Sequence, residues 1–486
     1  MRNFALLTDM YELTMIQGYY FSNPNQEAVF DMFFRRQPFD GGFTIFAGLD
    51  PLIDAISSIR FTDEEIAYLD SLGLFKPEFL HYLGKFKFTG DIYSVKEGTV
   101  VFPHEPLLRV QGPLIEAQFL ESVILNFINF QSLIATKTAR IVIASGNGAI
   151  IEFGLRRAHG SDGAISAARA AFIGGAFATS NVHAGKMFNI PVRGTMAHSW
   201  VMSFNTERDA FENYAELYPE QCVLLVDTFD TLKSGVPNAI HVFKKLKKKG
   251  IKDFGIRLDS GDLEYLSKEA RRMFDEAGLR EVKIYASNEL DEWIIHQIIE
   301  NGAPIDAWGV GTKLVTADKD PSLTGVYKIV ATNDGRGFQP RLKISNNPEK
   351  ITNPGIKNTY RFYDNDDKMI ADLICLDEED LSEKIERKES LRFNHPSINY
   401  AHFMLRDYAH ATKLLHPVIL KGKRVDRSPS LQDIQNFTKS QINSLDATYK
   451  RLLNPHIYKV SLSNDLKELK QNLIKEYCAM FNNERR

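Results

Sequence analysis

The chain has 486 residues and is 44% hydrophobic, which is enough for two or three domains with sizeable cores. Its 59 basic and 62 acidic residues leave a net charge of −3, and this balance excludes a general attraction to nucleic acid or anionic lipid. The three cysteines stand far apart and form no Cys-x-x-Cys pair, so neither a disulfide framework nor a thiolate zinc site is indicated. The N-terminus lacks an apolar signal core and no run approaches about 18 apolar residues, so we expect a cytoplasmic protein.

Residues 1–148 mix helical and β-type patterns. The segments LTDMYELTMIQGYYF and LIEAQFLESVILNFINFQSLIATKTARIVIA have helical periodicity, whereas AVFDMFFR and GTVVFPHEPLLRV are typical of strands. We therefore expect an N-terminal α/β domain over 1–148.

Residues 149–325 repeat a strand and a helix about every 30 residues, the length of one βα unit. The predicted strands are almost continuously apolar, which indicates a parallel sheet buried on both faces. Periodicity does not decide between a barrel and a doubly wound sheet, but a barrel is slightly favoured because polar residues follow nearly every strand. The predicted strands cover 149–153, 190–195, 222–228, 254–259, 282–287 and 306–312. The predicted helices cover 163–188, 237–250, 262–279 and 289–302.

The remaining residues return to a mixed pattern. Between 326 and 425, segments such as TYRFYDNDDKMIADLICL predict antiparallel strands joined by Asn/Asp turns. The tail over 426–486 has the periodicity of amphipathic helices. We expect the strands of 326–425 to join the N-terminal domain, with the barrel inserted between its two parts and a helical tail at the end.

Polar and small residues gather where the predicted parallel strands end. In a barrel these ends share one mouth, where the chemistry is found. Arginines there offer planar forks for anion oxygens, glycine-rich turns expose N–H groups to a phosphate, and carboxylates can hold Mg²⁺ together with substrate phosphates. The pattern therefore indicates a site for phosphate and pyrophosphate. The residues collected in this way are Phe153, Arg156, Arg157, Thr195, His198, Ser199, Asp227, Thr228, Arg257, Asp259, Ser260, Asp262, Ser287, Asn288, Gly309, Gly311 and Thr312.

Simpler roles are open for several of these residues. Arg257 and Asp259 could form a structural ion pair, and Asp262 is more simply a helix cap than a metal ligand. Gly309 and Gly311 could serve only a tight turn. His198 has no His-x-His or His-Glu-x-x-His partner, which excludes the common zinc spacings and leaves a core imidazole or a catalytic group. The lysine-rich segment 244–250 is most simply the basic end of a helix.

Five ordered motifs resemble the nicotinate phosphoribosyltransferase family. They are LLTDMYELTM, EFGLRRAHGSDGAISAARAAFIGGAFATSNV, GTMAHSWVMSF, GIRLDSGDL and DAWGVGTKLVT, and the resemblance continues through KISNNPEKITNPG and RLLNPHIYKVSLS. It implies an irregular, incomplete α/β barrel with an α/β sandwich domain that C-terminal strands complete, and it resolves the barrel question.

The resemblance also implies an activity. Such enzymes, which are classed as ligases although the chemistry is glycosyl transfer, join nicotinate to phosphoribosyl pyrophosphate in NAD salvage. The products are nicotinate mononucleotide and pyrophosphate, and ATP hydrolysis is coupled to the reaction. A histidine in the Gly-Thr-x-Ala-His-Ser turn is phosphorylated by ATP, and His198 occupies that place. A neutral imidazole nitrogen is a capable nucleophile.

Further roles follow by position in the resembling motifs. Phe153 is expected to sandwich the pyridine ring with Tyr11 of a neighbouring subunit in a homodimer. Arg257 is expected to face the nicotinate carboxylate, with Thr195 nearby. The remaining expected contacts are Arg156 and Arg157 to pyrophosphate or the ring, Gly309, Gly311 and Thr312 to the 5′-phosphate, Ser199 and Ser260 to substrate, and Asp259 and Asp262 to ribose and Mg²⁺.

Specificity is expected from the residue after the Gly-Thr pair. Nicotinamide-specific relatives carry an aspartate there, and Met196 in this chain suits the acid instead. Three hypotheses remain open: the nicotinate enzyme, a relative that accepts nicotinamide or quinolinate, and a silent barrel that only binds phosphometabolites. The last is disfavoured because His198 and Arg257 both stand in their motifs, and quinolinate would need further facing cations, for which only Arg156 and Arg157 are candidates.

Overall fold

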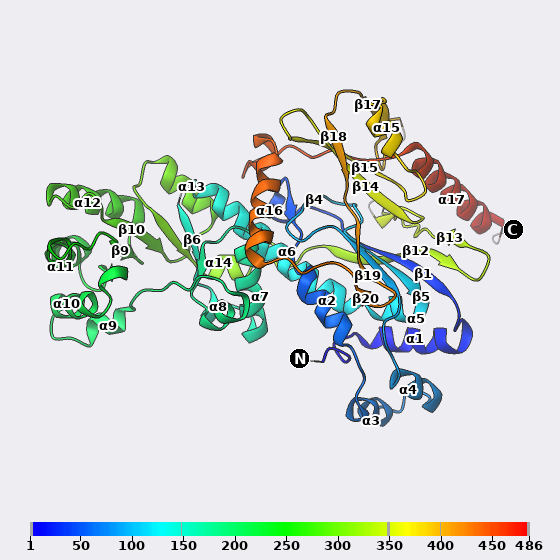
Figure 1. Ribbon diagram of the computed structural model, residues 1–486, viewed down its shortest axis with the longest axis horizontal. Coiled ribbons are helices and arrows are strands. Elements are labelled where there is room, and N and C mark those ends of the chain that lie inside the picture. The colour runs from blue at the N-terminus through cyan, green and yellow to red at the C-terminus, as the bar shows by residue number, and fades with distance from the viewer. Residues whose placement is uncertain (1–2, 147, 348–349, 399, 484–486) are drawn as a thin grey trace. The chain divides into compact units, whose positions relative to one another are not determined.

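The computed structural model describes residues 3–146, 148–347, 350–398 and 400–483, and the chain divides into two compact units. The first unit combines Met1–Leu133 with Ser322–Arg486, and the second is Ile134–Pro321 (Figure 1). The flanks thus form one unit and the middle another. The second unit begins inside a long helix, α6 (Glu121–Ala144), rather than at 149, because the C-terminal part of that helix packs within it: Ala135 and Thr138 lie against Gly174.

The first unit is built on two large sheets. Its seven-stranded antiparallel sheet has the order β13-β12-β1-β5-β3-β19-β20, so the strands of the N-terminal flank lie between two pairs of strands from the C-terminal flank. The strands are β1 (Glu27–Phe34), β3 (Asp91–Ser94), β5 (Leu108–Pro113), β12 (Gly325–Asn333), β13 (Phe338–Pro340), β19 (His416–Leu420) and β20 (Lys423–Arg424). This arrangement confirms the expected α+β domain made from both ends of the chain.

The second sheet of this unit is mixed and has the order β17-β16-β21-β15-β14-β18. Its strands are β14 (Lys357–Tyr363), β15 (Met369–Leu376), β16 (Leu391–Asn394), β17 (His402–Leu405), β18 (His410–Lys413) and β21 (Val460–Leu462). The tail, which we expect to be helical, contains α16 and α17 and also β21, which pairs in parallel with β15. A short ladder joins β2 (Thr44–Ile45) to β4 (Val100–Val101).

The helices of the first unit flank its sheets, and α2 and α5 contribute most, together with β1, to a large apolar core. They are α1 (Met10–Ser22), α2 (Leu49–Ser58), α3 (Asp63–Ser71), α4 (Pro77–Leu83), α5 (Leu114–Phe119), the first part of α6, α15 (Ser382–Glu386), α16 (Leu431–Ser444) and α17 (Asn464–Asn483). Within the described residues, one stretch, Leu114–Ala144, is long and apolar enough to cross a membrane, but 67% of its most apolar window is buried inside the protein, as in a core helix. Polar residues interrupt the stretch, so a search for an unbroken apolar run does not find it.

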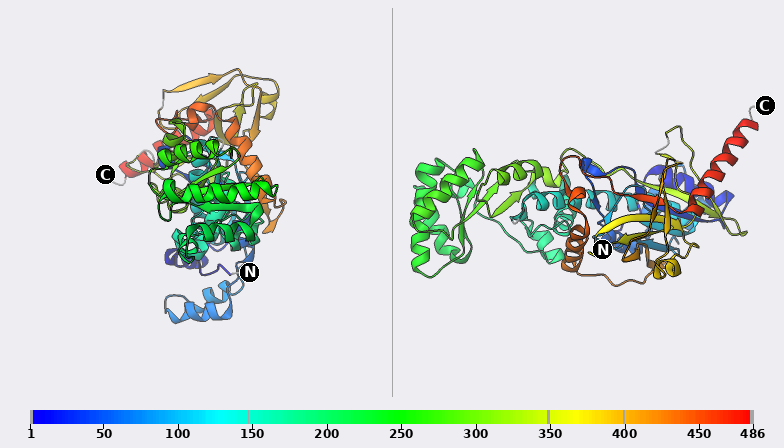
Figure 2. Two further views of the ribbon diagram at one scale, coloured as in Figure 1. Left: turned by 90° about the vertical axis from the view of Figure 1, so that its left-hand side faces the viewer. Right: turned by 90° about the horizontal axis from the view of Figure 1, so that it is seen from above.

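The second unit contains a curled, fully parallel six-stranded sheet of order β7-β6-β11-β10-β9-β8. Its strands are β6 (Ala149–Glu152), β7 (Ala178–Thr179), β8 (Cys222–Leu225), β9 (Phe254–Leu258), β10 (Lys283–Ser287) and β11 (Ala307–Val310). The sheet does not close, which agrees with the expected incomplete barrel. Figure 2 gives two further views of this sheet and its flanking green helices.

The helices of the second unit follow the strands in the expected alternation. They are α7 (Gly160–Ile173), α8 (Val182–Phe188), α9 (His198–Met202), α10 (Glu207–Leu217), α11 (Val236–Lys248), α12 (Leu263–Glu276), α13 (Glu292–Glu300) and α14 (Thr312–Val315). Two predictions here are wrong. The helix expected over 163–188 ends at Ile173, before Gly174 and Gly175, and gives way to β7 and α8, while the strand expected over 190–195 contributes only a bridge at Val192.

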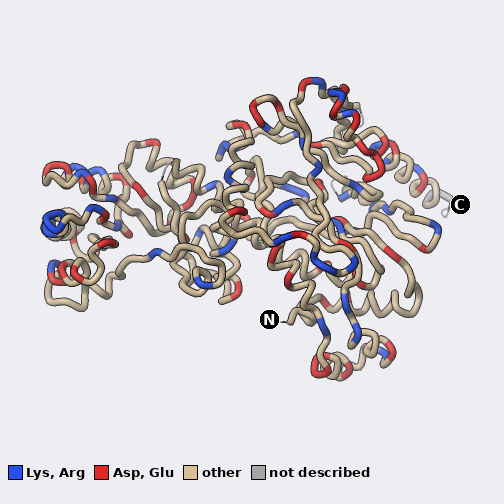
Figure 3. The backbone as a smooth tube through the Cα atoms, in the orientation of Figure 1, with Lys and Arg blue, Asp and Glu red and all other residues tan. Residues whose placement is uncertain are grey.

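Basic and acidic residues alternate along both units, with a basic cluster at the end of α11 (Figure 3). Lys245 and Lys247 of that cluster are bound to Glu212 and Glu281, at 2.9 and 2.7 Å. The cluster therefore has the structural role expected of a basic helix end. The three cysteines, Cys222, Cys375 and Cys478, are free.

Candidate active site

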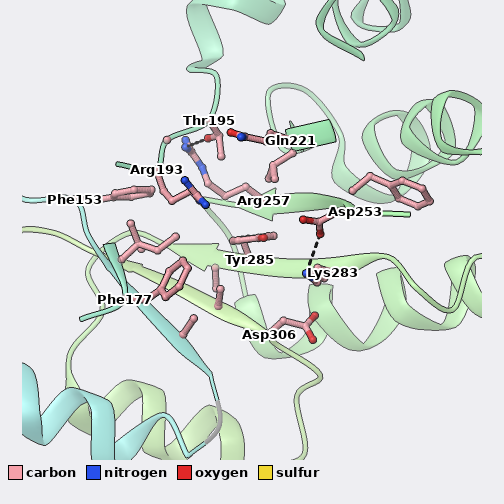
Figure 4. A pocket seen from close by; sticks show the side chains of 18 residues that line it. Phe153, Phe177, Arg193, Thr195, Gln221, Asp253, Arg257, Lys283, Tyr285 and Asp306 are labelled. Carbon is pink, nitrogen blue, oxygen red and sulfur yellow. Dashed lines mark hydrogen bonds and ion pairs between the residues drawn. The ribbon is translucent and has the colours of Figure 1, made fainter. Parts of the chain in front are cut away.

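Successive residues of the parallel strands face opposite sides of the sheet, and this alternation creates the site. On one side, Leu224, Ile256 and Ile284 pack into the core with the helices. On the other side, Val223, Arg257 and Tyr285 line a cavity of about 400 Å³ (Figure 4). The strands thus offer one apolar face for stability and one mixed face for a ligand.

Phe153 and Gly309 form the aromatic wall of this cavity. Both residues line it, and a Cβ atom added at Gly309 would lie 2.5 Å from the Phe153 ring. Gly309 belongs to β11, where it pairs with Ser287 on one side and Ile151 on the other. Its missing side chain therefore makes room for the aromatic ring, a role that the sequence did not indicate.

Arg257 brings a guanidinium to the same cavity. Its Nη1 donates a hydrogen bond to Thr195 Oγ1, and its Nη2 lies 3.9 Å from Asp259 Oδ1. Burial lowers the pKa of Arg257, while Asp259 and Asp227 act in the opposite direction and Arg156 adds to the lowering. Its buried Nε has no hydrogen-bond partner among the described residues. The guanidinium therefore has donor capacity left for an anion.

His198 lies at the start of α9, between a hydroxyl and a carboxylate. Its Nδ1 is 3.1 Å from Thr228 Oγ1, and its Nε2 is 3.6 Å from Asp259 Oδ2. The side chain is 40% exposed, so it is neither a core imidazole nor closed to a substrate. Asp259 in turn accepts a hydrogen bond from Ser287 Oγ, and Ser287 pairs with Gly309. These contacts place His198, Arg257 and the end of β11 at one edge of the sheet.

Asp227 organises this edge, although its place after a predicted strand was the only role that we expected of it. Its Oδ2 accepts hydrogen bonds from Asp259 N (2.8 Å) and Ser260 Oγ (2.7 Å). Its Oδ1 is buried without a partner in the described structure. A buried carboxylate oxygen is costly to leave unpaired, so this atom is available to a ligand hydroxyl or a cation.

Asp262 caps a helix. Its Oδ1 accepts a hydrogen bond from Tyr265 N at 3.0 Å at the start of α12. Asp262 also lies with Asp259 around a second hollow of about 350 Å³ beyond the strand ends. The described residues contain no group of three or more potential metal ligands. Two carboxylates suit Mg²⁺, because this ion typically combines one or two carboxylates with substrate phosphates.

The remaining predicted residues differ in their placement. Gly311 and Thr312 form the turn that leads from β11 into α14, and Gly311 lies against the Phe153 backbone. Arg156 and Arg157 are exposed on the short helical turn after β6, and Ser199 is exposed on α9. Tyr11 lies on α1 in the other compact unit and is 46% exposed.

The role expected of Met196 is wrong. This side chain is 6% exposed and packs in the core with residues such as Val201 and Phe211, so it does not line the cavity. Residues 191–193 run alongside β7, with bonds from Thr179 N to Pro191 O and from Arg193 N to Thr179 O. Arg193 and Thr195 line the cavity from this segment, whereas Met196 faces the other side. The two-residue alternation of extended chain accounts for the difference.

Several lining residues were missed by the sequence analysis. Phe177, Arg193 and Tyr285 line the cavity, and Figure 4 shows them around the same hollow as Phe153 and Arg257. Tyr285 could have been identified from sequence, because it lies two residues before Ser287 on the same strand and therefore faces the same side of the sheet. Phe177 and Arg193 lie outside regular strands, so no comparable signal existed for them.

Comparison with known proteins covers nearly the whole chain. Residues 6–129, 149–335 and 356–470 match the N-terminal domain, family and C-terminal domain models of nicotinate phosphoribosyltransferase (NAPRTase). The chain is 45% identical to nicotinate phosphoribosyltransferase of Bacillus subtilis (strain 168), over 97% of this chain and 95% of that protein. The corresponding protein of Dictyostelium discoideum is 38% identical, with 96% and 88% covered. The crystal structure of human nicotinic acid phosphoribosyltransferase matches with a TM-score of 0.83 at 30% identity, over 96% of this chain and 100% of that one. The chain therefore belongs to the nicotinate phosphoribosyltransferase family.

Proposed function

We propose that the protein transfers the phosphoribosyl group of phosphoribosyl pyrophosphate to nicotinate in NAD salvage, giving nicotinate mononucleotide and pyrophosphate. The observation that carries this proposal is one cavity with an aromatic wall at Phe153 and a guanidinium at Arg257, which lies 3.9 Å from Asp259 of the strand-end cluster that contains His198. An aromatic acid matches the cavity, and the phosphates match the strand ends.

In the proposed reaction, the pyridine nitrogen attacks the anomeric carbon as the bond from that carbon to pyrophosphate breaks. The electron pair of the broken bond leaves with pyrophosphate, and the ribose passes through an oxocarbenium-like state. Phe153 and Arg257 align the ring, while Arg156 and Arg157 take up charge on the departing pyrophosphate. Gly311 and Thr312 hold the 5′-phosphate, with Ser199 and Ser260 at the substrate. Alignment and stabilisation of separating charge are the main contributions.

Magnesium is the metal that fits this site. Asp259 and Asp262 would hold it at the hollow beyond the strand ends, together with the pyrophosphate oxygens. When bound, the ion neutralises charge on the leaving pyrophosphate.

We further propose that ATP phosphorylates His198. The imidazole lies between Thr228 Oγ1, 3.1 Å from Nδ1, and Asp259 Oδ2, 3.6 Å from Nε2, and these two groups orient the ring. Attack of a neutral ring nitrogen on the γ-phosphorus forms the N–P bond as the bond to ADP breaks, and ADP leaves with that electron pair. Asp259 stabilises the positive charge that develops on the ring.

We also propose that the protein is a homodimer in which Tyr11 of one subunit completes the site of the neighbouring subunit. Tyr11 exposes 46% of its surface on α1, as a ring that serves another chain requires. Quinolinate is the second candidate substrate, because Arg193 adds a guanidinium to the cavity that a second carboxylate would need.

The test is product formation by the purified protein. Phosphoribosyl pyrophosphate is supplied with nicotinate, nicotinamide or quinolinate, with and without ATP, and pyrophosphate release is measured. We expect release with nicotinate, faster with ATP, and a preference over nicotinamide of at least ~100-fold in kcat/KM, since a mismatched buried polar group costs a few kcal/mol. Comparable turnover of both bases contradicts the proposal.

The role of His198 has its own measurement. With γ-³²P-ATP, the wild type should retain label that is lost in acid, and His198→Ala should retain none while keeping its fold by circular dichroism. Stoichiometric labelling of His198→Ala would remove this histidine from the mechanism.

A further inference from the structure

We propose that Arg193 binds the carboxylate of the pyridine substrate together with Arg257 and thereby sets the preference for the acid over the amide. This inference rests on the proposed function. Arg193 belongs to none of the motifs that resemble the family, although it directly precedes one of them, GTMAHSWVMSF. It replaces Met196, which packs in the core, as the source of specificity.

The position of Arg193 follows from the extended segment that precedes α9. Arg193 is two residues before Thr195, and the two share the face that lines the cavity. Thr195 accepts the hydrogen bond from Arg257 Nη1, so the cavity face of this segment already contacts one guanidinium. Figure 4 shows the Arg193 side chain extending into the cavity between Phe153 and Arg257.

Arg193 has no acidic partner among the described residues. Its Nη1 donates to the carbonyl of Val192 at 3.0 Å, and its guanidinium carbon lies 5.9 Å from the centre of the Phe177 ring. Neither contact neutralises the charge. An arginine held over an aromatic ring, with its remaining donors directed into a cavity, is suited to bind a planar carboxylate.

The acidic residues of the cavity are already engaged elsewhere. Asp253 pairs with Lys283 at 2.8 Å, and Asp306 Oδ2 accepts a hydrogen bond from Ile284 N at 2.7 Å. These groups lie at the N-terminal ends of β9, β10 and β11, whereas Arg257 lies near the C-terminal end of β9. Among the described residues, Arg193 therefore keeps a positive charge that no carboxylate pairs, in the cavity that Phe153 also lines.

The chemistry explains discrimination between the two bases. Nicotinate presents two anionic oxygens, each able to accept from a guanidinium, whereas nicotinamide presents one carbonyl oxygen and an NH₂ donor that faces a donor. Two guanidiniums therefore favour the acid twice, by attraction and by the mismatch of the amide.

The test compares two variants. Arg193→Met keeps a long side chain but removes the positive charge, and Arg193→Lys keeps the charge but lacks the planar guanidinium. Lys283→Met is the matched control, because Lys283 lines the same cavity but is already paired with Asp253. We expect Arg193→Met to raise KM for nicotinate about tenfold, with kcat and the KM for phosphoribosyl pyrophosphate within about twofold of wild type. The nicotinate-to-nicotinamide ratio of kcat/KM should fall about tenfold, Arg193→Lys should recover part of it, and Lys283→Met should leave it unchanged.

The outcomes separate this inference from the proposed function. A wild-type protein that makes no nicotinate mononucleotide contradicts the proposed function itself. An active wild type whose ratio is unchanged in Arg193→Met overturns only the role of Arg193, as does an equal loss in Lys283→Met. Efficient wild-type use of quinolinate also overturns it, because Arg193 would then serve a second carboxylate.

Discussion

At the residue scale, the contact between Gly309 and Phe153 shows how a missing side chain builds a binding wall. The aromatic ring occupies the space that any Cβ at position 309 would need. The ring cannot keep its place beside a larger residue, since protein interiors accommodate overpacking only by moving side chains or backbone.

We therefore predict that Gly309→Ala raises KM for nicotinate by about tenfold or more, because the displaced Phe153 ring no longer stacks on the pyridine. Steady-state kinetics with varied nicotinate measure this effect. Gly163→Ala is the control, since a Cβ there meets nothing within 4 Å in α7. Equal KM values for the two variants would contradict the proposed wall.

Glu12 gives a prediction of pH dependence at the same scale. Burial raises the pKa of Glu12 to about 7, although Gln118 Nε2 donates to it at 2.8 Å. The folded state therefore binds a proton that the unfolded state has lost, and stability falls as pH rises from about 4.5 to about 7. Glu12→Gln should raise the free energy of unfolding by about 1–2 kcal/mol at pH 8 and leave it nearly unchanged at pH 4.5. Urea unfolding at both pH values measures the difference, and an equal gain at both would contradict it.

At the element scale, the start of α12 combines a cap with a proposed metal ligand. Asp262 accepts the N–H of Tyr265 whether or not Mg²⁺ is present. Because asparagine caps a helix about as well as aspartate, the two roles can be separated by substitution.

We predict that Asp262→Ala lowers the free energy of unfolding by about 1 kcal/mol, whereas Asp262→Asn changes it little. If Asp262 also holds magnesium, Asp262→Asn should need more Mg²⁺ for half-maximal activity. Denaturant unfolding and a Mg²⁺ titration of turnover are the two measurements. An unchanged Mg²⁺ requirement in Asp262→Asn would leave this residue a cap alone.

The sequence predicted the parallel strands because their apolar runs are short, regular and separated by helices of clear periodicity. It failed where the local pattern is ambiguous. Residues 163–188 are helical in composition, but Gly174 and Gly175 end the helix, and β7 forms only by pairing with β6. The cavity side of 190–196 also escaped prediction, because an extended segment reveals its inward face only once its neighbours are known.

At the scale of the whole molecule, the chain order separates parts of the proposed site. Tyr11 belongs to the unit formed by the two flanks, whereas Arg257 belongs to the unit formed by the middle. The strand-end cluster itself could be predicted from sequence, since parallel strands bring their ends to one edge. The proposed contribution of Tyr11 to a neighbouring subunit came from the family resemblance alone, because no periodicity within one chain encodes contacts with another copy.

Mixing two inactive variants tests the shared site. Tyr11→Ala and Arg257→Ala each damage every site of a homodimer, but a mixed dimer has one site with both residues intact. We predict that activity returns to about one quarter of wild type after random exchange of subunits. Mixed dimers are isolated with two affinity tags, and inactivity of these dimers would show that Tyr11 serves its own chain.

The alternation along 192–196 also guides the engineering of new substrate preferences. A library aimed at other pyridines should randomise positions 193 and 195, which line the cavity, and keep 196 as methionine for folding yield. Randomising position 196 as well would add variants whose core packing is disrupted. Neighbours one peptide bond apart would thus respond to selection in opposite ways, one evolving freely and the other resisting change.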